Sequence, residues 1–277
     1  MMNARDYSSS MRKYLYFLSL ACLFSHVSVI HATEIERPVC FPLGVADANG
    51  KIGYVRDFAK GIEAIDLGSG QLLWKTAVAS RPLIAFDNLL VAGAVGNKPN
   101  IFIVSLFDAA RSGEIRIQAS VEFPPWVTVY PVDGPAFAIQ AQLRRSNERW
   151  ELLLEWRARS RYTGGAHPPP FIERQNRKDA VGEVSIDLKT GTVVSTSSKE
   201  IIDDAQAPAS PPDKKLMALI SEPGVEEACL IGQRIYYLVE GQRDECLLKA
   251  RALNSHKILW EHVLSCKRNS RPPALRQ

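Results

Sequence analysis

The residues best suited to chemistry gather in one irregular segment, positions 157–183 of the 277-residue chain. The segment combines guanidinium groups, a phenol and an imidazole, which are side chains that bind anions and sugars. The candidate binding residues are Arg157, Arg159, Arg161, Tyr162, His167, Arg174 and Arg177. A glycine pair and a run of three prolines predict a bent, then stiff loop inserted into a larger domain. The alternative interpretation is a solvated loop whose charges only keep the protein soluble.

No motif typical of an active site accompanies these residues. No pattern places a serine or cysteine beside His167, so its imidazole is not expected to act as a catalytic base. The chain has no Cys-x-x-Cys pair, and its histidines lack the spacing of zinc ligands. Asp203 and Asp204 lie in a polar stretch typical of a solvated linker. We therefore expect no catalytic residue, no cofactor and no bound metal.

The first 32 residues have the pattern of a secretory signal peptide. Arg12 and Lys13 precede an apolar run, residues 14–32, which has no acidic residue and ends in a small side chain. A basic start, an apolar middle and a small residue at the cut are typical of such signals. A lipoprotein cleaved before Cys22 and an uncleaved anchor helix are the alternatives. The sequence thus predicts a periplasmic or secreted protein.

Export would place the remaining cysteines in an oxidising compartment, where thiols pair. These cysteines are Cys40, Cys229, Cys246 and Cys266. Four cysteines allow three pairings, and we expect Cys229–Cys246 and Cys40–Cys266. The first pair flanks a stretch that fits neighbouring strands, and the second would tie the first strand region to the last. Four reduced thiols are the alternative.

The charge of the chain excludes one class of partner. The net charge is +4, with 23% charged and 46% hydrophobic residues, and loss of the predicted signal would lower it to about +2. Glutamates interleave the arginines around Trp150 and Trp156, whose even spacing fits one face of a buried strand. A nucleic-acid surface, which needs a concentrated basic face, is therefore not expected.

A phrase that recurs along the chain indicates the elements that must position these residues. "AIDLGSGQLLWK" (64–75) returns as "SIDLKTGTVVST" (185–196) and "ARALNSHKILWE" (250–261), and more loosely as "LFDAARSGEIRI" (106–117). Each copy has two strand-forming runs around a polar turn, which is the signal of a β-hairpin. Repeats at intervals of about 40–50 residues are typical of propeller blades or solenoid turns.

Strand patterns on either side of each hairpin extend these copies to four units of four strands. The predicted strands are 40–47, 51–57, 61–67 and 71–78; then 82–86, 88–95, 100–107 and 114–123; then 126–132, 136–143, 150–159 with 183–188, and 192–197; then 216–221, 234–241, 246–253 and 257–264. Four antiparallel sheets in series predict an all-β fold, a β-propeller of about four blades. We expect this domain to occupy residues 33–266, with a flexible tail at 267–277.

The recurring phrase resembles the repeat of the pyrroloquinoline-quinone-like propellers, the quinoprotein dehydrogenase superfamily. The resemblance implies that Trp74 and Trp260 pack between blades, with Arg116 and Ser195 in the corresponding places of the weaker copies. The quinone enzymes of that family have seven or eight blades, a calcium ion and often an adjacent cysteine pair. This chain is about half as long and has no Cys-Cys dipeptide, so it resembles a short member without enzyme activity. Its Asp66 and Asp187 fit turn positions, where the side chain bonds to backbone.

Four blades leave three arrangements open: a small closed ring, an open array completed by another copy or protein, or a degenerate propeller with a miscounted blade. Open sheet edges would favour self-association. We expect an exported, non-catalytic binding or scaffolding protein of the cell envelope. Its partner would be an envelope protein or an anionic ligand, contacted through the segment 157–183. The alternative is a sensor of a small quinone or anion, or a degenerate relative of the quinone dehydrogenases.

Overall fold

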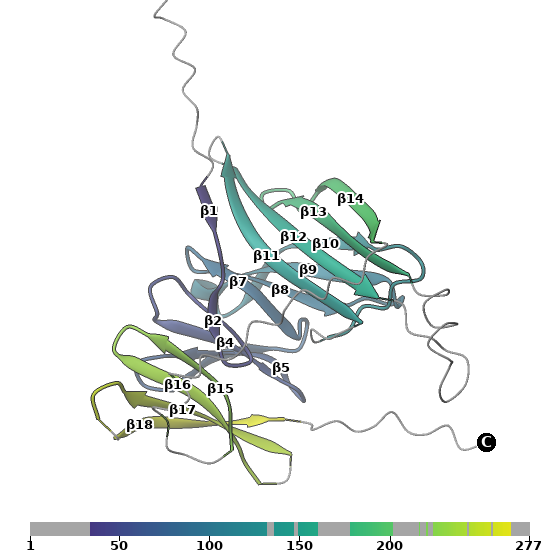
Figure 1. Cartoon of the computed structure of the whole chain (residues 1–277). Helices are drawn as coiled ribbons and strands as arrows, with labels where there is room; N and C mark the ends of the chain where they lie inside the picture. The colour runs from purple at the N-terminus through teal and green to yellow at the C-terminus, as the bar shows by residue number, and fades with distance from the viewer. Residues whose placement is uncertain are drawn as a thin grey trace, which may run out of the picture. The chain divides into compact units, whose positions relative to one another are not determined.

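The fold is described from a computed structural model (Figure 1). The described residues are 34–131, 136–146, 149–159, 178–201, 216, 220, 224–242, 244–255 and 257–266. A compact unit begins at Glu34. The predicted signal peptide, residues 1–32, and the predicted tail, residues 267–277, lie outside the described residues.

The first two sheets follow each other directly along the chain. The first sheet contains β2 (Val39–Phe41), β3 (Gly44–Ala46), β4 (Ile52–Asp57), β5 (Gly61–Asp66) and β6 (Leu72–Thr76), paired in that order. The second sheet contains β7 (Arg81–Phe86), β8 (Leu89–Val95), β9 (Ile101–Asp108) and β10 (Glu114–Glu122), also paired in chain order. A 3-10 turn, η1 (Ala109–Arg111), joins β9 to β10. These strands confirm the predicted second unit and three strands of the first. The strand predicted at 40–47 is instead an antiparallel pair, β2 and β3, so the first sheet has five strands.

The third and fourth sheets repeat this pattern. The third sheet contains β11 (Phe137–Ser146), β12 (Arg149–Arg159), β13 (Asp179–Asp187) and β14 (Val193–Ile201), with β1 (Glu34–Glu36) added beside β11. The fourth sheet contains β15 (Val225–Ile231), β16 (Arg234–Glu240), β17 (Glu245–Ala252) and β18 (Ile258–Ser265). All strand pairs are antiparallel. The predicted all-β class with four antiparallel sheets is therefore confirmed.

The inner edges of the third and fourth sheets differ from the prediction. Residues 126–131, predicted as a strand, contain no strand; β1 instead pairs with β11 at this edge, as Figure 1 shows. In the fourth sheet β15 takes the place predicted for 216–221, of which only Leu216 and Ile220 are described. Both replacements escaped the pattern because β1 is short and β15 has an acidic pair, Glu226–Glu227, within it.

Three apolar clusters fill the spaces between successive sheets. One lies between the fourth and first sheets, one between the first and second, and one between the second and third. Burying apolar side chains on both sides of a sheet stabilises the stack by removing that surface from water. The packing order is thus fourth, first, second, third.

A repeated contact joins the sheets in this order. The Trp260 ring lies against Gly70 in the turn of the first sheet, and the Trp74 ring lies against Gly113 in the turn of the second. Ile117 lies in the same way against Gly191 of the third sheet. The residue of the second sheet that corresponds to the tryptophans is therefore Ile117. Arg116, expected in that place, lies at a β-bulge and forms an ion pair with Asp108.

The series ends at the third sheet. Ser195, four residues after Gly191, is exposed and too small to fill a neighbouring turn. In the sequence, the corresponding turn phrase of the fourth unit has His256 where the other three copies have glycine. Among the described residues no equivalent docking contact joins the third sheet to the fourth, and the sheets do not close into a ring.

The described part of the chain contains no helix long and apolar enough to cross a membrane.

Candidate functional site

The structure places the two ends of the predicted binding segment on neighbouring strands. β12 continues to Arg159 and β13 begins at Asp179, so both flanks of 157–183 belong to the third sheet rather than to a loop. Arg157 pairs with Val181 across these strands. The other candidates, Arg161, Tyr162, His167, Arg174 and Arg177, lie outside the described residues.

Arg159 has a structural partner. Its Nε lies 3.2 Å from Asp179 Oδ2, and the carboxylate is almost fully buried. The pair closes the end of the β12–β13 ladder, where Arg159 and Asp179 are directly opposite. A buried carboxylate needs such a partner, so Arg159 stabilises the sheet and contributes little to a binding surface.

A hollow of about 550 Å³ lies on the polar face of the third sheet. Strand register brings Gln140, Glu155, Glu183 and Ser197 into one row across β11 to β14. The adjacent row on the same face contains Ala138, Arg157, Val181 and Lys199. Both rows line the hollow. We call this surface the polar face.

The opposite side of the same strands faces the core. Successive side chains of a strand point to opposite faces. Trp156, between Glu155 and Arg157, is buried in the cluster shared with the second sheet. Its ring lies against Gly182, where a Cβ would be 2.7 Å from the indole. Trp156 and Gly182 also line the hollow, although the tryptophan is almost fully buried.

The polar face has balanced charge, arranged as an acidic row beside a basic row. Glu155 and Glu183 lie opposite each other in one row, and Arg157 and Lys199 lie in the adjacent row, so β12, β13 and β14 supply two acidic and two basic groups. Glu155 accepts a hydrogen bond of 3.1 Å from Gln142 Nε2, which orients its carboxylate. Glu183 and Lys199 are exposed. Such a surface complements a partner with both acidic and basic groups better than it complements a simple anion.

A second hollow, of about 400 Å³, lies between the second and third sheets. Phe86, Leu89, Leu106, Trp150 and Leu188 give it an apolar lining, and Arg149 and Lys189 supply positive charge. The Phe86 and Trp150 rings are 5.4 Å apart and tilted. An apolar lining with a few charged groups is typical of a small-molecule site. Sequence reasoning interpreted Trp150 as a core residue and missed Arg149 and Lys189, because only the fold brings β12 and the β13–β14 turn together.

Turn aspartates behave as the sequence predicts. Asp66 accepts a hydrogen bond from Ser69 N, and Asp187 accepts bonds from Lys189 N and Thr190 N. The bonds from Ser69 lower the pKa of Asp66, and those from Lys189 and Thr190 outweigh desolvation and lower the pKa of Asp187. These carboxylates hold turns and are not arranged as ligands. Within the described residues no group of three or more His, Cys, Asp or Glu side chains is placed to hold a metal ion.

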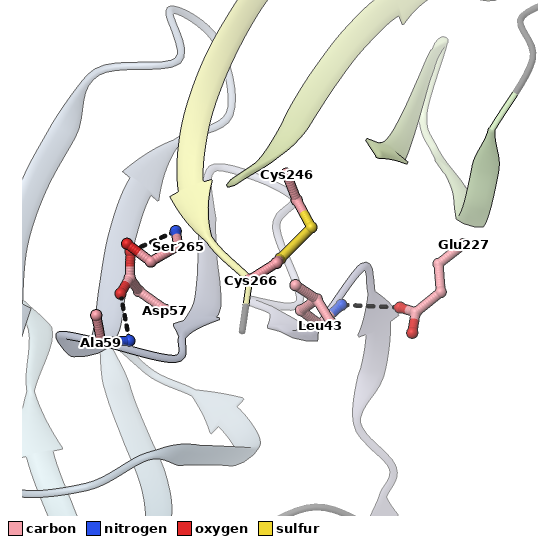
Figure 2. Close-up of a disulfide and its surroundings, with 7 residues drawn as sticks. All are labelled: Leu43, Asp57, Ala59, Glu227, Cys246, Ser265 and Cys266. Atoms are coloured by element: carbon pink, nitrogen blue, oxygen red, sulfur yellow. Dashed lines mark hydrogen bonds between the residues drawn. A yellow bond between two sulfur atoms is a disulfide. The ribbon is translucent and has the colours of Figure 1, made fainter. Parts of the chain in front are cut away.

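A buried acidic cluster lies at the seam between the first and fourth sheets. Glu63 Oε2 is 2.8 Å from His262 Nε2, and Lys60 lies 3.4 Å from the other Glu63 oxygen. Asp57 accepts hydrogen bonds from Ser265 N, Ala59 N and Lys60 N. Burial raises the pKa of both carboxyls, but hydrogen bonds and Lys60 outweigh it and hold the pKa of Asp57 and of Glu63 below the usual range. Figure 2 shows Asp57 bonded to Ser265 and Ala59.

The structure pairs the cysteines differently from the expectation. Cys246 and Cys266 form a disulfide with their Cα atoms 5.6 Å apart (Figure 2). Cys229 and Cys246 cannot pair, because β16 runs between β15 and β17 and two strand spacings separate them by about 10 Å. Cys40 cannot pair with Cys266, which is already bonded. Cys40 and Cys229 are free thiols in the structure.

No protein-family model matches the chain, and no curated protein matches it significantly.

Proposed function

We propose that the protein is an exported, non-catalytic binding module of the cell envelope whose polar face contacts a protein partner. The observation that carries the proposal is the hollow on the third sheet, which is lined by an acidic row beside a basic row at the open end of the sheet series. A surface in this position is available to a partner because no fifth sheet of the chain follows it among the described residues. Export is supported by the Cys246–Cys266 disulfide, since such bonds persist in oxidising compartments.

The architecture fits an open β-propeller of the pyrroloquinoline-quinone-like type. Each sheet has four or five antiparallel strands, most of them consecutive in the sequence, and the outer hairpin turns of three sheets each receive a large side chain from another sheet. Trp74 and Trp260 pack in the manner that the resemblance implies for docking tryptophans. Propellers present loops and sheet ends for binding, so the proposed fold and the proposed role agree.

A charge-reversal pair tests the proposed surface. Cells expressing the tagged full chain are crosslinked mildly, and captured proteins are quantified by mass spectrometry for wild type and for Arg157→Glu with Lys199→Glu. The control, Lys75→Glu with Lys257→Glu, changes net charge equally at exposed residues of β6 and of the β17–β18 hairpin. We expect a partner that the polar-face variant loses at least tenfold and the control retains. Equal capture by both variants would refute the placement.

The second hollow favours a second candidate function, the binding of a small amphiphilic anion. Apolar Phe86 and Trp150 would hold the apolar part, and Arg149 and Lys189 would attract the charge. Decanoate, a simple amphiphilic anion, should raise the melting temperature of the wild-type chain and have less effect on Arg149→Gln with Lys189→Gln. No stabilisation of either protein by decanoate would count against this candidate.

A further inference from the structure

Two thiols that are distant in sequence come together where the first sheet meets the fourth. Cys40 lies in β2 and is exposed, whereas Cys229 lies in β15 and is half-buried. β2 and β15 are the edge strands of the first and fourth sheets, and they contact each other. Neither strand has another partner on this edge among the described strands.

Polar and apolar contacts hold these two strands together. Leu43 N, three residues after Cys40, donates a hydrogen bond of 2.9 Å to Glu227 Oε2, two residues before Cys229 (Figure 2). The side chains of Phe41 and Cys229 belong to the same apolar cluster. These contacts hold the two backbone segments that carry the thiols next to each other.

The pKa of the Cys229 thiol is also affected by Cys40. Burial, together with the nearby Cys40 and Glu227, raises the pKa of the Cys229 thiol to about 12. An influence of Cys40 on this pKa requires that the two sulfur atoms lie close together. The contact between β2 and β15 also places the two cysteines near each other, and it does not depend on the pKa.

We propose that Cys40 and Cys229 form a second disulfide that fastens the first sheet to the fourth. Of the three possible pairings of the four cysteines, this is the one compatible with the Cys246–Cys266 bond. That bond joins β17 to the residue after β18 within one sheet, whereas the proposed bond joins strands about 190 residues apart. It would lock the seam made by Asp57, Glu63, His262 and Trp260.

The bond forms by exchange with a disulfide oxidant, for which oxidised glutathione serves as the probe. The thiolate of exposed Cys40 attacks one glutathione sulfur, forms a mixed disulfide and releases one reduced glutathione. The Cys229 thiolate then attacks the Cys40 sulfur and releases the second glutathione. Two electrons pass from the two cysteines to the oxidant, and the two thiol protons end on the two glutathione thiols.

The environment of Cys229 makes the second step slow in the folded protein. A thiol whose pKa is about 12 supplies little thiolate at neutral pH. At pH values below that pKa, each increase of one pH unit raises the thiolate fraction about tenfold. Conversion of the mixed disulfide to the protein disulfide should therefore accelerate as pH is raised from 7 to 9.

Peptide mapping tests the pairing directly. The reduced full chain is incubated with oxidised glutathione at pH 8.5, quenched with acid, alkylated and digested without reduction. We expect a peptide pair that joins Cys40 to Cys229. Cys40→Ser should leave Cys229 alkylated or glutathionylated, and the control Cys22→Ser should keep the linked pair. Recovery of Cys40 and Cys229 as separate adducts, or a link from either to another cysteine, would overturn the proposal.

Denaturant unfolding gives a second readout that does not depend on digestion. A reductant should lower the guanidinium midpoint of the oxidised wild type more than that of Cys40→Ser, because the variant has only the Cys246–Cys266 bond to lose. Circular dichroism of Cys40→Ser under reducing conditions establishes that the variant folds. Equal shifts of the two midpoints would contradict the proposed Cys40–Cys229 disulfide.

Discussion

At the scale of single residues, glycines in the hairpin turns decide how closely neighbouring sheets approach. Gly70, Gly113 and Gly191 all have positive φ, and each receives a large side chain from another sheet. A Cβ at Gly70 would lie 2.6 Å from the Trp260 ring. The recurring turn phrase in the sequence therefore encodes an intersheet contact as well as a local bend.

Replacing one of these glycines with alanine separates the cost of backbone strain from the cost of the intersheet clash. Gly70→Ala should destabilise the protein by about 2 kcal/mol or more, because it adds a clash with Trp260 to the strain of a left-handed backbone. Gly232→Ala is the matched control, since Gly232 also has positive φ but nothing lies within 4 Å of its added Cβ. Urea unfolding measures both. Equal losses of stability would show that turn strain alone matters.

The two docking tryptophans differ in one hydrogen bond. Trp260 Nε1 donates to Leu67 O at 3.2 Å, whereas Trp74 Nε1 is buried without a partner among the described residues. Trp260→Phe should therefore cost about 1 kcal/mol more than Trp74→Phe in free energy of unfolding. Leu67 O keeps bonds from Arg234 and Tyr236, so it is not left unpaired. A larger loss for Trp74→Phe would contradict this assignment.

At the scale of elements, regular hairpins were predictable and irregular edges were not. The second unit and the last three strands of the first agree with the structure because apolar residues flank clear turns, whereas the strand predicted at 40–47 turns at Pro42 and Leu43 into two strands, β2 and β3. β15 escaped prediction because Glu226 and Glu227 interrupt its pattern, and β1 because three residues are too few to show one. Tertiary pairing with β16 and β11 forms these strands.

Of the residues that line the polar face, the sequence predicted only Arg157 as a binding residue. Arg157 attracted notice through its arginine-rich neighbourhood, but Glu155, Glu183 and Lys199 join it through strand register. The available signal was that all alternate positions of β12 from Arg149 to Arg159 are charged except Leu153. The cysteine pairing failed for a similar reason: the sequence suggested adjacent strands, and the fold inserted β16 between them.

The seam between β4, β5 and β18 should make stability sensitive to acid. The folded-state pKa values of Asp57 and Glu63 lie below their usual 3.8 and 4.5. A lowered pKa means that each carboxylate stabilises the fold above its unfolded pKa, and that this stability is lost as pH falls through the folded value. The free energy of unfolding should therefore decline below about pH 4.

Neutral variants test the source of this decline. Glu63→Gln and Asp57→Asn should each be less stable at pH 7 and show a shallower loss between pH 5 and 2.5, measured by urea unfolding. Glu114→Gln, an exposed carboxyl outside the seam, should leave the pH profile unchanged. A profile as steep in both seam variants as in wild type would place the acid sensitivity elsewhere.

At the scale of the whole molecule, the sheets form a series with unlike ends. Large side chains and glycine turns join the fourth sheet to the first, the first to the second and the second to the third. The third sheet lacks both a docking side chain at Ser195 and a following sheet among the described residues. Its polar face is consequently the surface on which we place the partner.

Site-specific photo-crosslinking in living cells tests this placement most directly. A photoreactive amino acid is introduced at Ser197 on the polar face or at Val263, an exposed residue of β18. The account predicts a discrete crosslinked partner from position 197 and none from position 263. Crosslinking from position 263 alone, or equally from both, would contradict a binding site on the third sheet.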